Sequence, residues 1–141
     1  MITAGLINAG CAFTQDIDTG KIELPALEST DYIVEYEGYT SSYNVLTQTP
    51  EWVAYELTKE ETYGEAVREG KFFSPDERVL LPQPDDYDYR GSGWTRGHLA
   101  PAADFRWSDD AMWETFHFTN CCPQDEDLNN GMWNTLEKKC R

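Results

Sequence analysis

The stretch Gly91-Ser-Gly-Trp-Thr-Arg-Gly-His-Leu-Ala-Pro-Ala-Ala-Asp-Phe105 runs from a glycine-containing loop into a short segment that predicts a β-strand carrying His98. A serine followed by two acids predicts an N-capped helix over residues 108–114. Alternating apolar residues over 116–121 predict a second strand, and residues 129–139 predict a final helix. The expected order is therefore strand, crossing helix, strand and helix, with His98 on the first strand.

Upstream of this stretch, runs rich in β-branched and aromatic residues at 43–48 and 51–58 predict a β-hairpin. Thr49-Pro50 lies between the two runs and is expected to form the turn. One further strand is expected near residues 32–36. The proline- and aspartate-rich segment 75–88 predicts a loop rather than a regular element.

Length and composition bound the class of protein. The 141 residues fit one domain, and 40% hydrophobic residues with 13% aromatics predict a packed globule. The net charge of −15 excludes a basic surface over the whole fold for binding nucleic acid. No apolar run approaches the roughly 18 residues needed to span a membrane.

The charge is unevenly distributed. Within residues 90–107 the bases Arg90, Arg96 and Arg106 face a single acid, Asp104. Charges act over a Debye length of about 8–10 Å, so this local basic island is a better guide to function than the total charge.

The cysteines and the N-terminus bear on compartment. Cys11, Cys121, Cys122 and Cys140 allow three full pairings, but their spacing matches no zinc site. Free buried thiols are favoured over a disulfide to Cys140. The apolar start lacks the basic region of a signal peptide, although Ala-Gly-Cys11 is similar to a lipoprotein cleavage site.

Three spaced motifs carry a resemblance to a known family. Gly91–Phe105 is followed by Phe118-Thr-Asn-Cys-Cys-Pro-Gln124 and then by Asp127-Leu-Asn-Asn-Gly-Met-Trp-Asn-Thr-Leu-Glu137. In this order they resemble the DNA/RNA non-specific endonucleases, and Trp52-Val-Ala-Tyr-Glu-Leu57 matches the hairpin before the catalytic segment of that family. The resemblance covers roughly residues 43–141.

The resemblance implies an α+β fold with a ββα-metal (His-Me finger) nuclease core behind an N-terminal β-hairpin. It divides the chain into an N-terminal leader or extension, 1–40, and an endonuclease domain, 41–141. Domains of the family continue past the last helix, so we expect the C-terminal part of the family domain to be missing.

Phosphodiester hydrolysis needs a base that activates water and a cation that neutralises developing charge. The resemblance implies that His98 is the base, and imidazole has the side-chain pKa nearest to working pH. It implies that Asn129 is the protein ligand of Mg²⁺, with Mn²⁺ as the alternative ion. Magnesium keeps several waters and takes few protein ligands, preferably oxygen.

Other matched positions complete the predicted site. Glu137 matches an acid that orients the waters of the metal, and Asn120 matches an asparagine that helps to hold the substrate and the histidine loop. Arg96 is expected to contact phosphate or to pin the loop through an acid. Arg68 matches the arginine that stabilises transition-state charge.

Two further positions stand apart from the predicted site. His117 points to the opposite face from its neighbours and is expected to be structural. Thr95 stands where the family usually has Asp, so carboxylate support for the histidine loop must come from elsewhere.

The predicted function is a Mg²⁺-dependent endonuclease that is non-specific for sequence and sugar, with DNA and RNA as substrates. The alternative is a truncated, catalytically inactive nuclease-like binding fragment. A carbohydrate-active enzyme and a thiol hydrolase using Cys121 or Cys122 are weaker alternatives. We expect a secreted or periplasmic protein without a membrane span, with lipid anchoring at Cys11 and a homodimer left open.

Overall fold

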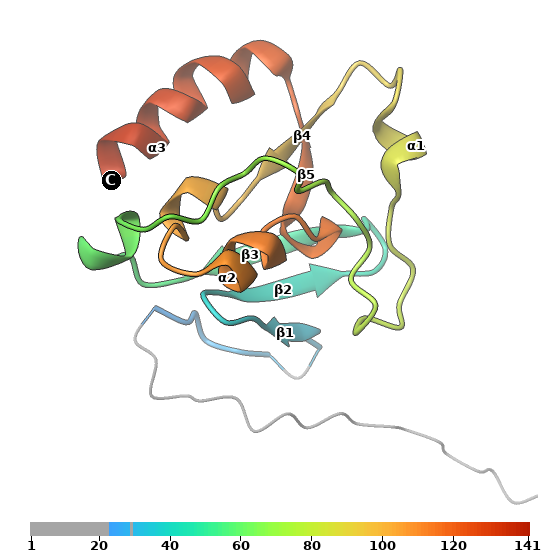
Figure 1. The fold of residues 1–141 in the computed structure, drawn as a ribbon. Coiled ribbons are helices and arrows are strands. Elements are labelled where there is room, and N and C mark those ends of the chain that lie inside the picture. Colours follow the sequence, from blue (N-terminus) through green and yellow to red (C-terminus); the bar gives the residue numbers. More distant parts are fainter. Residues whose placement is uncertain (1–22, 29) are drawn as a thin grey trace, which may run out of the picture.

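The first three strands form an antiparallel sheet in the order β1–β2–β3 in the computed structural model, which describes residues 23–28 and 30–141 (Figure 1). The strands are β1 (Ile33–Glu35), β2 (Thr40–Asn44) and β3 (Thr49–Ala54). The predicted strand near residues 32–36 is confirmed. The predicted hairpin is also confirmed, but its strands lie earlier than the runs at 43–48 and 51–58, and residues 45–48 form its turn.

The turn of the hairpin lies earlier than Thr49-Pro50. The side-chain oxygen of Asn44 accepts hydrogen bonds from the backbone N–H groups of Leu46 (2.8 Å) and Thr47 (3.3 Å), which closes the turn before residue 49. Pro50 instead belongs to β3 and pairs with Tyr43, next to a register shift in β2. An irregular ladder tolerates a residue that lacks an N–H donor, so the proline does not end the strand.

The second sheet pairs β4 (Thr95–His98) with β5 (Cys121–Gln124) in antiparallel fashion, which places His98 opposite Cys121. Between the strands lie the short helices η2 (Ala102–Asp104) and α2 (Asp109–Glu114). The cap predicted for α2 is confirmed, because the Ser108 hydroxyl accepts the backbone N–H of Ala111 at 3.1 Å.

The predicted final helix begins in the π-helical turn η4 (Leu128–Trp133) and continues as α3 (Asn134–Cys140). Figure 1 shows this helix at the top of the molecule, beginning near the end of β5 and running away from β4 and β5 towards the C-terminus. None of the helices in the described ranges is long and apolar enough to cross a membrane.

Two sequence expectations fail. Residues 116–121 are not a strand: Phe118–Asn120 form a short helix, η3, and β5 begins only at Cys121. Phe116 and Phe118 are 2% and 0% exposed, and His117 between them forms an isolated parallel bridge with Ser74 rather than a ladder.

The segment predicted as a loop contains the helical turn α1 (Asp86–Tyr89). Asp85 caps this turn: its side chain accepts the N–H of Tyr87, and the Asp88 side chain accepts the N–H of Asp85. A short helix, η1 (Glu60–Thr62), lies in the segment after β3.

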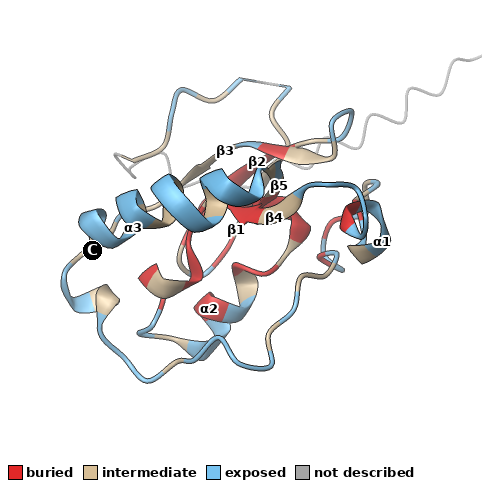
Figure 2. Ribbon diagram, turned by 90° about the horizontal axis from the view of Figure 1, so that it is seen from above, coloured by how far each residue is buried: buried red, intermediate tan, exposed pale blue. Residues whose placement is uncertain are grey.

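The core lies between the first sheet, α2 and the segment after β4 (Figure 2). A smaller cluster of Tyr89, Phe118 and Cys121 lies behind β5, and Phe73 packs on both clusters. The helix α3 is exposed along most of its length in Figure 2. The main cluster consists of Val34, Tyr36, Tyr39, Tyr43, Val79, Ala100, Ala102, Phe105, Ala111, Met112 and Phe116.

A cluster of buried polar groups connects the first sheet to the segment that contains Asp76. Asp76, which is 2% exposed, accepts hydrogen bonds from the Tyr36 hydroxyl (2.7 Å) and from the backbone and guanidinium N–H groups of Arg78. The Tyr36 hydroxyl also contacts the hydroxyl of Thr119. Every partner of this carboxylate is a donor, as a buried charge requires.

Candidate active site

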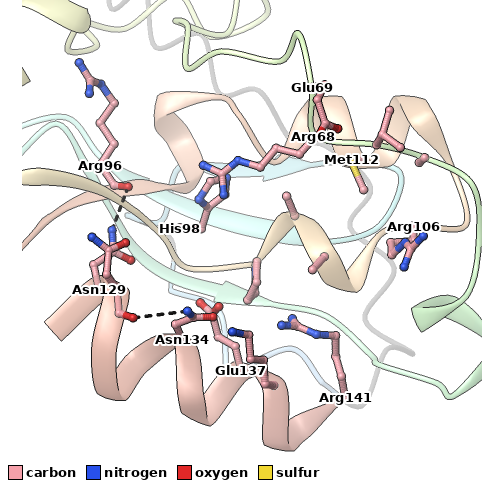
Figure 3. Close-up of a pocket in the computed structure, with 17 residues that line it drawn as sticks. Arg68, Glu69, Arg96, His98, Arg106, Met112, Asn129, Asn134, Glu137 and Arg141 are labelled. Atoms are coloured by element: carbon pink, nitrogen blue, oxygen red, sulfur yellow. Dashed lines mark hydrogen bonds between the residues drawn. The ribbon is translucent and has the colours of Figure 1, made fainter. Parts of the chain in front are cut away.

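A pocket of about 470 Å³ opens between α3, the segment after β4 and residues 66–69 (Figure 3). Its wall draws on segments far apart in the sequence, which fold together through the β4–β5 ladder and the helix that follows it. All the predicted site residues except Asn120 line this pocket: Arg68, Arg96, His98, Asn129 and Glu137.

His98 is held mainly by aromatic rings. It ends β4, is 8% exposed, and its ring centroid lies 4.6 Å from that of Phe73 and 4.9 Å from that of Phe116. Burial, and secondarily the charge of Arg68, lower the pKa of His98 to about 3. The imidazole is therefore neutral at physiological pH, and its Nε2 has no hydrogen-bond partner among the described residues.

This buried imidazole should make folding stability sensitive to acid. The pKa of His98 is about 3 in the folded protein and near 6.5 when the group is unperturbed, so the unfolded chain binds more protons between these values. We therefore expect the free energy of unfolding to fall as pH drops from about 6.5 towards 3. Urea unfolding of wild type and His98→Leu at pH 7.5, 6.5, 5.5 and 4.5 measures this. Equal slopes against pH in the two proteins would contradict it.

Asn129 lies in the first turn of η4 and faces the start of β4. Its side-chain Nδ2 donates to the Thr95 hydroxyl oxygen (3.1 Å) and to the backbone carbonyl oxygen of Arg96 (3.4 Å), as Figure 3 shows for the second bond. No donor of the described chain bonds to its Oδ1. The amide oxygen is therefore available to a ligand.

The oxygen donors of the pocket fit a Mg²⁺ ion. Glu137, whose pKa is raised by burial, lines the same wall as Asn129. Among residues 23–28 and 30–141 there is no cluster of three or more His, Cys, Asp or Glu that could hold a metal. An amide oxygen, with a carboxylate in the same pocket and water for the other positions, is a ligand set that Mg²⁺ accepts.

The guanidinium of Arg96 is engaged elsewhere. It forms an ion pair with Asp86 of α1 and lies over the Tyr89 ring, 5.4 Å from its centroid. Figure 3 shows this side chain pointing away from His98, so it is the backbone of Arg96 that borders Asn129. The ion pair with Asp86 is the contact that a pin through an acid would make, and the role of Arg96 stays a prediction.

Asn120 lies behind the pocket rather than in its wall. It is 0% exposed, its Oδ1 accepts the N–H of Ala100 (2.8 Å), and its Nδ2 donates to the carbonyl oxygens of Ala100 and Thr115, both at 2.9 Å. The backbone carbonyl of Asn120 also accepts the N–H of Leu99 at 3.0 Å. Asn120 therefore holds the loop after His98 and presents no surface to a substrate.

Basic residues that the sequence analysis did not assign also line the pocket, namely Arg106, Lys138 and Arg141. Arg141 pairs with Asp104, which is 2% exposed and accepts the hydroxyl of Tyr55 at 2.8 Å. Arg141 follows Glu137 by one helical turn, so the prediction that Glu137 faces the site already placed Arg141 on the same face.

Cys121 and Cys122, the cysteines nearest to His98 in the described part of the chain, do not form a reactive centre. Cys121 is opposite His98 in the ladder, but it is 0% exposed and its sulfur bonds to the Tyr89 hydroxyl at 3.6 Å. Burial raises the pKa of Cys121 to about 12 and also raises that of Cys122, so both stay protonated thiols. The thiol-hydrolase alternative fails on this ground. Cys121, Cys122 and Cys140 are free, while Cys11 lies outside the described residues.

The motifs and this geometry agree with comparisons to known proteins. The model of the DNA/RNA non-specific endonuclease family matches residues 20–141. The chain belongs to this family. Its α+β architecture is the ββα-metal nuclease fold, and it superposes on a chain of the crystal structure of the EndoG/EndoGI complex with a TM-score of 0.75 and 33% identity.

Curated members of the DNA/RNA non-specific endonuclease family give the same picture. The chain is 41% identical over 108 residues to the mitochondrial nuclease EXOG of Xenopus laevis and 38% identical over 125 residues to the human mitochondrial endonuclease G. These matches cover 76% and 88% of this chain but 30% and 41% of the relatives. The superposed EndoG/EndoGI chain is covered over 48% of its length, against 82% of this chain.

These relatives correct one expectation. EXOG, endonuclease G and the similar nuclease of Saccharomyces cerevisiae are all named as mitochondrial. The expectation of a secreted or periplasmic protein is therefore wrong. It rested on secreted members of the same endonuclease family and on a short apolar start, including Cys11, that lies outside the described residues.

Proposed function

We propose that this chain carries the catalytic centre of a Mg²⁺-dependent endonuclease that hydrolyses phosphodiester bonds of DNA and RNA. The observation that carries the proposal is that His98, Asn129 and Glu137 line one pocket with a surplus of basic side chains. Arg68, Arg106 and Lys138 stand there against Glu69 and Glu137, while Arg96 and Arg141 also line the pocket but are paired with Asp86 and Asp104, in a chain of net charge −15. The local field therefore favours an anion where the total charge does not.

The proposed reaction begins with His98 as general base. Its neutral imidazole takes a proton from a water molecule, the water oxygen bonds to phosphorus, and the bond from phosphorus to the 3′ oxygen breaks. The departing 3′ oxygen takes a proton from solvent water and His98 returns its proton to solvent, so the products are a 5′-phosphate and a 3′-hydroxyl end. A phosphate in the pocket places negative charge near the imidazole and raises the pKa of His98, which strengthens the base at the moment of use.

The other residues act on charge and position. Asn129 and Glu137 would hold the ion through their oxygens, and a bound Mg²⁺ would supply charge neutralisation at the phosphate and the leaving oxygen. Arg68, whose guanidinium lies 5.5 Å from the Phe116 ring centre and acts on His98 electrostatically, is placed to stabilise negative charge near the base. Arg96 and Asn120 keep β4 and the following loop in place.

Removal of the metal or of its proposed ligand should stop the reaction. We expect the wild-type chain to cut plasmid DNA and total RNA with Mg²⁺ or Mn²⁺ but not with EDTA. Asn129→Ala should lower the initial rate by about 10²–10³-fold, because the ion contributes several kcal/mol of charge stabilisation. Gel electrophoresis of timed digests measures both effects.

The matched control is Asn130→Ala, since Asn130 is adjacent and its bond to Asn134 is made through the backbone carbonyl. This control should cut at the wild-type rate. Cutting that persists in EDTA, or equal losses in the two variants, would refute the metal role of Asn129. A folded wild type that does not cut in Mg²⁺ would instead support the inactive nuclease-like binding fragment, since the chain spans 30% to 41% of the length of these relatives.

A further inference from the structure

Thr95 makes a bond that the proposed mechanism does not use. It begins β4 opposite Gln124 of β5, and its hydroxyl donates to the backbone carbonyl oxygen of Gln124 at 2.9 Å. The same hydroxyl oxygen accepts a hydrogen bond from Nδ2 of Asn129 at 3.1 Å. This threonine therefore links the strand ladder to the first turn of η4.

The Thr95 hydroxyl has a single proton, and this determines the direction of its hydrogen bond with Asn129. A threonine hydroxyl has one proton to donate, and a backbone carbonyl can only accept. Because this proton is donated to the carbonyl oxygen of Gln124, the Thr95 hydroxyl can only accept a hydrogen bond from Asn129. The other neighbour of the Asn129 amide, the carbonyl oxygen of Arg96 at 3.4 Å, is also an acceptor.

Two acceptors on one side determine how the Asn129 amide sits. The NH₂ group must turn towards Thr95 and Arg96, because the opposite orientation would place the amide oxygen against two lone pairs. The amide oxygen then lies on the other side of the group, where no donor of the described chain meets it. This is the atom that the proposed function needs as a ligand.

We infer that Thr95 is a positioning residue that orients the Asn129 amide so that its oxygen, and not its nitrogen, is presented to the cation. The inference rests on the proposed function of Asn129. The inference also accounts for the threonine at position 95, where the family usually has Asp. A hydroxyl that has donated its own proton can accept a hydrogen bond from the amide as a carboxylate does, but without a negative charge. Thr95 thus supports the metal ligand rather than the histidine loop.

The test compares substitutions that differ by a hydroxyl. Thr95→Val keeps the β-branched shape that suits a strand and removes the acceptor, while Thr95→Ser keeps the acceptor. Loss of an outer-shell partner weakens metal binding by about 10–100-fold. We expect this loss for Thr95→Val and wild-type affinity for Thr95→Ser, measured in the full 141-residue chain by Mn²⁺ titration with electron paramagnetic resonance.

Activity gives a second, independent measurement. In Thr95→Val the Mg²⁺ concentration for half-maximal cleavage should rise by a similar factor, while KM for plasmid at saturating Mg²⁺ stays unchanged. In an Asn129→Ala background, Thr95→Val should cause no further loss, since the effect passes through that amide. Thr95→Ala replaces Thr95→Val if thermal unfolding shows that the valine variant does not fold.

The outcomes separate this inference from the proposed function. Wild-type Mn²⁺ affinity in a folded Thr95→Val or Thr95→Ala, beside weakened binding in Asn129→Ala, overturns the role of Thr95 alone. An equal loss in Thr95→Ser also overturns it, because the acceptor is retained there. Wild-type affinity in Asn129→Ala overturns the proposed metal ligand, whatever Thr95 does.

Discussion

His98→Leu is expected to abolish cleavage while leaving the folded protein at least as stable as the wild type. The imidazole is 8% exposed between Phe73 and Phe116, and its Nε2 has no partner in the described part of the chain. A buried polar group without a hydrogen bond costs about 1–3 kcal/mol, and leucine fills much of the same space without that cost. Loss of the base should lower the initial rate by about 10²–10⁴-fold.

Two measurements together identify this role. Plasmid relaxation gives the rate, and urea unfolding at pH 7.5 gives the free energy of unfolding. The control is the other histidine of the chain: His117 stacks on Tyr36 with ring centroids 5.9 Å apart and does not line the pocket, so His117→Gln should keep the wild-type rate. Wild-type cutting by His98→Leu would assign the base to another group.

Asp76→Ala is expected to lower the free energy of unfolding by about 1–3 kcal/mol, because it removes a buried hydrogen-bond acceptor. Its carboxylate is 2% exposed and meets the Tyr36 hydroxyl and several N–H groups of Arg78. Burial acts to raise the pKa of Asp76, but the hydrogen bonds from Arg78 and Tyr36 outweigh it and lower the pKa. Removing the carboxylate takes an acceptor from the buried Tyr36 hydroxyl, whereas the half-exposed guanidinium of Arg78 keeps Glu114 and water, and urea unfolding at pH 7 measures the cost.

Glu77→Ala is the matched control, because Glu77 is the neighbouring acid and is exposed. Surface substitutions of this kind change stability by less than about 0.5 kcal/mol. A loss below 1 kcal/mol in Asp76→Ala, or an equal loss in both variants, would show that the polar cluster does not stabilise the fold.

Local signals in the sequence predicted much of the fold. Ser108 before two acids gave the correct start of α2, because a helix cap is decided within one turn of chain. The same chemistry was present at α1, where Asp85 and Asp88 form a capping box, but prolines nearby favoured a loop. The apolar residues Phe116 and Phe118 alternate with polar ones in the sequence, but Thr119 and Asn120 are also buried and Phe118–Asn120 are helical, so the pattern of residue types alone could not identify this element.

The arrangement of the candidate site depends on tertiary contacts that local sequence patterns do not predict. Motif positions predicted His98, Asn129 and Glu137, and the structure brings them to one pocket. No local pattern shows that Arg96 pairs with Asp86, or that Asn120 is buried, because both facts follow from how α1 and the loop after β4 pack. The residue types in the motifs predicted the chemistry of the site, whereas tertiary packing determines which of these side chains line the pocket.

The three hydrogen bonds of the Asn120 side chain have a consequence for binding. They fix both backbone groups of Ala100 just after His98, so this loop loses its conformational freedom when the protein folds. A ligand entering the pocket then meets a loop that is already ordered, and the entropy of ordering it does not oppose association. The histidine is thereby held in a preorganised frame before any substrate arrives.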